Sequence, residues 1–152
     1  MNKDHLSHNV LKKIGFSLLA EGKTIRVRAE GFSMYPSIKP GSVIFIEPFK
    51  IGAEPIPGEI IAWKRDSGFV VHRLIRCYIQ KHQKYFITRG DSIMVEDDPV
   101  LFDQIAGKVV QVEKPEGNAV PADSFLDKKP NYSFNRFLVR IISQFYRIKR
   151  IL

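Results

Sequence analysis

Residues 30–48 read Glu-Gly-Phe-Ser-Met-Tyr-Pro-Ser-Ile-Lys-Pro-Gly-Ser-Val-Ile-Phe-Ile-Glu-Pro, and the rest of the chain is arranged around this stretch. Gly31 gives the backbone freedom two residues before Ser33, and the prolines that follow, beginning with Pro36, turn and stiffen the chain. Four consecutive apolar residues, 43–46, then predict a buried strand. The pattern indicates a serine hydroxyl that is held at a fixed place in a β structure.

A serine is a weak nucleophile near neutral pH and needs a base within hydrogen-bonding reach. Residues 69–75, Phe-Val-Val-His-Arg-Leu-Ile, supply one, because they predict a strand that carries His72. Carboxylates that can hold the imidazole in the right tautomer follow at Asp91 and in the pair Asp97-Asp98. The order serine, histidine, aspartate is typical of an acyl-transfer site.

Three stretches together resemble the boxes of the type I signal peptidase superfamily in their order and rough spacing. They are Gly31 to Pro36, Val71 to Ile75, and Thr88 to Asp91 with Asp97 six residues later. The resemblance runs from about residue 24 to residue 112 and is to the archaeal and endoplasmic-reticulum branch, in which histidine replaces the bacterial general-base lysine. It implies a serine endopeptidase of the signal peptidase/LexA-like fold that cleaves a signal or leader peptide.

The resemblance also implies roles for individual residues. Ser33 is expected to be the nucleophile, His72 the general base and Asp97 the residue that orients the imidazole. Asp91 is a second catalytic candidate that can shape the site. Asp98 replaces Asp97 only if the loop carries one extra residue relative to other members.

The segment next to the serine is expected to bind the substrate and the oxyanion. The backbone amide of Ser33 is the natural oxyanion donor, and Met34 and Pro36 beside it are expected to contact the substrate. Gly31 stands where many bacterial members carry a serine whose hydroxyl assists. The resemblance further implies an extended substrate beside a strand, with small residues next to the cleaved bond.

Composition fits one folded domain with appendages. The chain has 152 residues, of which 44% are hydrophobic and 26% charged, as is usual for a globular protein. Its formal net charge is +8, and the basic excess is most visible at the C-terminus. This distribution favours an anionic membrane surface as a partner over nucleic acid, which is not expected.

Several features are not expected in this chain. The single cysteine, Cys77, excludes an intramolecular disulfide. His5 and His8 lack a third ligand in a zinc-like pattern, so we expect no metal and no cofactor. No apolar run reaches the roughly 18 residues of a membrane span, and lysines within the N-terminal apolar pattern argue against a secretory signal.

The order of patterns predicts a mainly β fold: a coiled, barrel-like antiparallel β domain with an amphipathic helix at each end. Short strands separated by glycine and proline turns indicate the β domain. The predicted segments are an N-terminal helix over 1–23, a β catalytic domain over 24–114, a linker over 115–132 and a basic helix over 133–152. Gly107 is expected to allow a bend or close packing within the last strand.

The C-terminal segment has the composition of an interfacial helix. An apolar stripe begins at Phe134 and is bordered by the basic residues Arg136, Arg140, Arg147, Lys149 and Arg150. A reversible hold on an anionic membrane is therefore expected through 134–152. A helix that docks on its own domain or on a partner is the other interpretation, with a soluble cytoplasmic protein as the alternative location.

Two alternatives to a signal-peptidase-like enzyme stay open. A LexA-like self-cleaving peptidase uses a lysine base, for which Lys81 and Lys84 are the candidates. A non-catalytic membrane-surface or peptide-binding module of the same fold would keep the architecture without the reaction. In either peptidase the expected partner is a peptide or pre-protein substrate.

Overall fold

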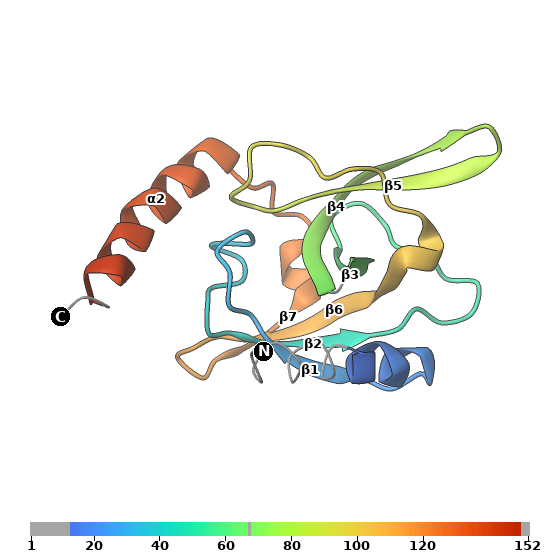
Figure 1. The fold of residues 1–152 in the computed structure, drawn as a ribbon, viewed down its shortest axis with the longest axis horizontal. Helices are drawn as coiled ribbons and strands as arrows, with labels where there is room; N and C mark the ends of the chain where they lie inside the picture. The colour runs from blue at the N-terminus through green and yellow to red at the C-terminus, as the bar shows by residue number, and fades with distance from the viewer. Residues whose placement is uncertain (1–12, 67, 150–152) are drawn as a thin grey trace, which may run out of the picture.

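The computed structural model describes residues 13–66 and 68–149 of the chain. In this part, seven strands form an antiparallel sheet (Figure 1). The strands are β1 (Ile25–Arg28), β2 (Val43–Glu47), β3 (Ile60–Arg65), β4 (Gly68–Gln80), β5 (Gln83–Arg89), β6 (Ile105–Glu113) and β7 (Ala119–Pro121). Their order across the sheet is β1-β2-β6-β3-β4-β5, and β7 pairs with β6. The predicted mainly β, antiparallel fold is confirmed.

The sheet bends but does not close into a barrel. Among the described residues β1 and β5 stand at opposite ends of the strand order, and register shifts interrupt the pairing of β2 with β6 and of β3 with β6. Gly107 lies in β6 where β2 passes close to it: a Cβ at this position would be 2.3 Å from the carbonyl oxygen of Glu47. The close packing predicted at Gly107 is confirmed.

The hairpin of β4 and β5 is longer than the sequence predicts. The polar composition of residues 78–84 predicts a connection between strands, but β4 continues to Gln80 and β5 starts at Gln83. The rings of Tyr78 and Tyr85 stack across the two strands, 5.3 Å apart. This outer part of the hairpin is mostly exposed, so it carries no alternation of apolar and polar residues that would reveal strands.

The segment 115–132 contains regular structure where the sequence predicts a linker. It forms β7 and then the 3-10 helix η2 (Ala122–Phe125). Phe125 is only 5% exposed and belongs to the core. Elements of three and four residues are too short to show a hydrophobic period, which explains why the sequence does not reveal them.

Buried side chains form two clusters. Along β3, Ile60 and Ala62 belong to one cluster, whereas Ile61 and Trp63 belong to the other. Successive residues of a strand point to opposite faces, so β3 is covered on both sides. The neighbouring strand β4 therefore pairs with a strand that is buried on both faces.

The two predicted helices are present in the described part of the chain. Residues 13–20 are helical, and Gly22 closes this helix with a φ of 81°. Residues 1–12 of the predicted N-terminal helix, with His5 and His8, lie outside the described residues, as do residues 150–152 of the C-terminal helix. Helix α2 (Tyr132–Lys149) reaches away from the sheet (Figure 1). None of the described helices combines the length and hydropathy needed to cross a bilayer.

Candidate active site

Ser33 lies in the turn that joins β1 to β2 and is half-buried. The turn is closed by hydrogen bonds from the amide of Tyr35 to the carbonyl of Phe32 and from the amide of Ile38 to the carbonyl of Met34. The side chains of Met34 and Ile38 are buried in the core. These two anchors fix the backbone around Ser33.

His72 lies on β4 opposite Ile61 of β3 and is 8% exposed. Its Nδ1 is 2.6 Å from Oδ2 of Asp97. The hydroxyl of Thr88 donates to the same oxygen at 2.7 Å, and the amide of Asp97 donates to the carbonyl of Thr88 at 2.8 Å. Asp97 is therefore held by β5 and in turn fixes one nitrogen of the imidazole.

The other nitrogen of His72 lies close to the turn between β1 and β2 that carries Ser33, the serine turn. A Cβ built on Gly90 would be 3.1 Å from His72 Nε2 and 2.6 Å from the carbonyl oxygen of Ser33. Gly90 thus fills the narrow space between the imidazole and the backbone of Ser33. Among the described side chains, no hydrogen bond joins the Ser33 hydroxyl to His72.

Ser33 and His72 line the same open pocket, which has a volume of about 440 Å³. The other lining residues come from the end of β3 and the first half of β4: Arg65, Asp66, Gly68, Phe69, Val70 and Val71. The sequence predicted none of these as site residues, although 69–71 directly precede the predicted base. The sequence signal that could have identified residues 69–71 as lining the site is their position on the same predicted strand as His72.

The carboxyl of Asp97 is ionised over a wide pH range. Burial pushes its pKa up, but hydrogen bonds from His72 and Thr88, with the positive charges of His72 and Arg65, outweigh this and hold the pKa below its usual value. A carboxylate that stays charged stabilises a protonated imidazole next to it. Asp97 can therefore both orient His72 and stabilise its charged form.

Asp91 is placed differently from Asp97. Its carboxylate is fully buried and pairs with Arg73, whose Nε and Nη2 each donate at 2.8 Å. The hydroxyl of Ser37 donates to the same carboxylate at 2.5 Å. The structure thus places this side chain in an ion pair beneath the serine turn, and the imidazole is paired with Asp97. The role of Arg73 was missed, although it adjoins His72 in the sequence.

Three further predicted positions lie away from the pocket. Asp98 is exposed, whereas its neighbour Asp97 contacts His72. Met34 is only 4% exposed and packs in the core, and Pro36 is exposed on the turn; neither lines the pocket. Alternate residues of the turn point inward to the core and outward to solvent, and the substrate contacts expected of Met34 and Pro36 stay a prediction.

The lysines of the alternative mechanism belong to the outer hairpin. Lys81 lies in the turn between β4 and β5 with a φ of 48°. Lys84 forms an ion pair with Glu54 and lies over the ring of Phe86. Neither lysine lines the pocket that contains Ser33.

Within the antiparallel β domain, Ser33 and His72 line one pocket and Asp97 contacts His72, an arrangement typical of serine peptidases. A family model described as Peptidase S24-like matches residues 5–110, well over half of the chain. The chain belongs to the Peptidase S24-like family, and serine peptidase activity is what this family implies. A search of curated proteins finds no match to the chain.

Proposed function

We propose that the protein is a serine endopeptidase that cleaves a signal or leader peptide from a precursor. Ser33 is the nucleophile, His72 the general base and Asp97 the residue that orients the base. The observation that carries the proposal is the 2.6 Å contact between His72 and Asp97 at the wall of a pocket that Ser33 shares. The archaeal and endoplasmic-reticulum signal peptidases, with their serine and histidine pair, are the branch that this assignment favours.

The reaction follows from the two nitrogens of His72. Nε2 accepts the proton of Ser33 while the serine oxygen bonds to the scissile carbonyl carbon, and Asp97 stabilises the imidazolium. The carbon–nitrogen bond then breaks, and Nε2 returns the proton to the leaving amine. Water attacks the acyl-enzyme by the same proton route and releases Ser33. Contacts between a serine and its base often tighten only when substrate is bound.

The amide of Ser33 is suited to stabilise the oxyanion. Among the described residues it donates no hydrogen bond to the protein, so it can donate to a carbonyl oxygen that becomes negatively charged. Gly31 provides no hydroxyl for this purpose. Stabilisation of the negative charge that develops on the carbonyl oxygen therefore depends on backbone N–H groups of the serine turn.

Among the described residues, one edge of the first part of β4 has no strand partner, which supports binding of an extended peptide. From Gly68 to His72, β4 pairs with β3 on one side, whereas its pairing with β5 starts only at Arg73. The other edge of this stretch borders the pocket, where a peptide can add as a strand through main-chain hydrogen bonds. Such a peptide runs along β4 and brings one of its bonds to Ser33 and His72.

Cleavage of a peptide mixture tests the proposal. The purified protein is incubated with peptides of diverse sequence, and new termini are identified by mass spectrometry. We expect cuts at a consistent position in extended peptides with small residues beside the bond, and none with Ser33→Ala. Equal cleavage by Ser33→Ala would assign the activity elsewhere, and self-cleavage lost on Lys81→Ala or Lys84→Ala would favour the LexA-like alternative.

We also propose that the enzyme binds peripherally to anionic membranes through α2. Five large apolar side chains of α2 are exposed and share one face by their spacing: Phe134, Phe137, Ile141, Phe145 and Ile148. Arg136, Arg140 and Arg147 are exposed on the same helix, which contains no acidic residue. An exposed apolar face with basic residues and no acidic ones matches an anionic lipid surface, to which each basic residue adds about 1 kcal/mol.

Vesicle sedimentation tests the membrane proposal. We expect the protein to pellet with vesicles of phosphatidylcholine and phosphatidylglycerol, and much less with phosphatidylcholine alone or at high salt. Phe137→Ser with Phe145→Ser should abolish pelleting. Ile51→Ser with Ile79→Ser is the matched control, because both isoleucines are exposed but lie outside α2. Pelleting that survives the α2 change, or that ignores lipid charge, would contradict this proposal.

A further inference from the structure

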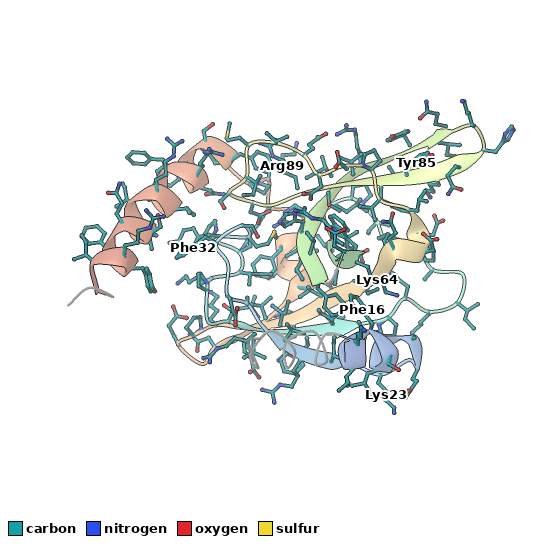
Figure 2. All side chains as sticks on the ribbon, viewed as in Figure 1. Phe16, Lys23, Phe32, Lys64, Tyr85 and Arg89 are labelled. Atoms are coloured by element: carbon teal, nitrogen blue, oxygen red, sulfur yellow. The ribbon has the colours of Figure 1, made fainter. Side chains whose placement is uncertain are left out.

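Helix α2 is attached to the parts of the β domain that carry the candidate site. Among the described residues, its polar and aromatic contacts with the domain involve Arg89, Asp91 and Phe32: the Arg89 guanidinium lies 3.5 Å from the ring centre of Tyr132, and the rings of Phe32 and Tyr146 meet edge to face at 5.8 Å. Figure 2 shows Arg89 and Phe32 on the side of the domain nearest to α2.

Asn135 makes the central contact. It is 5% exposed, in a helix whose neighbouring residues are mostly accessible. Its Nδ2 donates to the main-chain oxygen of Asp91 at 2.8 Å. A buried amide without a partner destabilises a protein by about 1–3 kcal/mol, so this asparagine fits its position only because of the bond to Asp91.

The segment that Asn135 holds is bonded to the serine turn. The amide of Ser92 donates to the carbonyl of Ser33 at 3.0 Å, and the hydroxyl of Ser92 donates to the carbonyl of Phe32 at 2.7 Å. Gly90, on the other side of Asp91, fills the space between Ser33 and His72. Asp91 itself is immobilised by its ion pair with Arg73.

We propose that Asn135 is a positioning residue, through which α2 holds residues 90–92 and so keeps Ser33 in register with His72. This inference rests on the proposed function and adds to it that α2 takes part in assembling the site. The hydrogen bond from Asn135 acts on the main chain of Asp91. The next residue, Ser92, is in turn hydrogen-bonded to the carbonyl of Ser33. Removing the bond from Asn135 lets the segment shift while the β core remains intact.

The test compares Asn135 of α2 with Asn131, the residue just before this helix, by reaction with a fluorophosphonate probe. Asn135→Leu keeps the side-chain size, removes the donor and improves helix propensity. Asn131→Ala is the matched control, because Asn131 Oδ1 caps the start of the helix by accepting from the amide of Phe134 and does not touch Asp91. We expect Asn135→Leu to lower the maximal rate of adduct formation by roughly tenfold to a hundredfold, with the half-saturating probe concentration unchanged, and Asn131→Ala to react at the wild-type rate.

Hydrogen exchange provides a second readout that does not need activity. The amide of Ser92 should exchange faster in Asn135→Leu than in the wild type, while amides of β3 keep their protection. If the wild type reacts with the probe and Asn135→Leu reacts equally fast, the role of Asn135 is overturned and the proposed function is not. Folded wild-type protein that never forms an adduct overturns the proposed function, and unchanged exchange at Ser92 overturns the link between α2 and the serine turn.

Discussion

Gly90 occupies a position in the candidate site that leaves no room for a side chain. A Cβ there would be 2.6 Å from the oxygen of Ser33 and 2.7 Å from Cγ1 of Ile93. We expect Gly90→Ala to lower the rate of peptide cleavage by roughly a hundredfold, since small displacements of a nucleophile have effects of this size. The unfolding free energy should fall by about 1–3 kcal/mol.

Gly31 offers the matched control for this prediction. It lies on the same turn as Ser33, but a Cβ at Gly31 would meet no atom within 4 Å. Gly31→Ala should therefore keep both cleavage rate and stability near the wild-type values, as measured by peptide cleavage and urea unfolding. Equal losses in the two variants would show that the close contacts of Gly90 are not the reason for its effect on cleavage.

Asp97 predicts a specific dependence of stability on pH. Its pKa in the folded protein lies below the usual value, so it binds protons more weakly in the folded than in the unfolded state. Its contribution is complete above the unfolded pKa of about 3.9 and is lost as the pH falls through the folded pKa. The wild type should exceed Asp97→Asn in unfolding free energy at about pH 5, and the difference should shrink as the pH falls below about 4. A difference that keeps growing below about pH 4 would contradict this assignment.

At the scale of elements, Phe125 tests whether residues 115–132 belong to the folded domain. Its side chain is buried in the core, and its carbonyl accepts from Nη1 of Arg73 at 2.7 Å. Phe125→Ala should reduce the unfolding free energy by about 3–5 kcal/mol. Phe134→Ala is the control, because Phe134 is exposed on α2, and it should change stability by no more than about 0.5 kcal/mol. Similar small effects of both changes would mean that the segment is a linker.

The elements differ in how far the sequence predicts them. The strand β2 is visible in the sequence because its first four residues are all apolar. The outer hairpin, β7 and η2 are not, since they are either exposed or only a few residues long. The contact of Asn135 with Asp91 has no sequence signal at all, because it joins two residues whose nearness depends on where α2 leaves the domain.

At the scale of the whole molecule, segments far apart in the chain meet at one pocket. The order of Ser33, His72 and Asp97 is readable from the sequence, and the contact of His72 with Asp97 is a property of the fold. The ion pair of Arg73 with Asp91 lies beneath the serine turn. The Arg73 guanidinium also donates a hydrogen bond to the carbonyl of Phe125. The core, the serine turn and the C-terminal region are thereby joined around the candidate site.

Whether Ser33 is an activated nucleophile can be read from the intact mass of the protein after exposure to a fluorophosphonate, with anionic vesicles present and absent. We expect one phosphonyl adduct on the wild type, mapped to Ser33, and none on Ser33→Ala or His72→Ala. Circular dichroism verifies that all three proteins are folded. An adduct that persists on Ser33→Ala, or a folded wild type that stays unmodified with and without vesicles, would contradict the claim that Ser33 is an activated nucleophile.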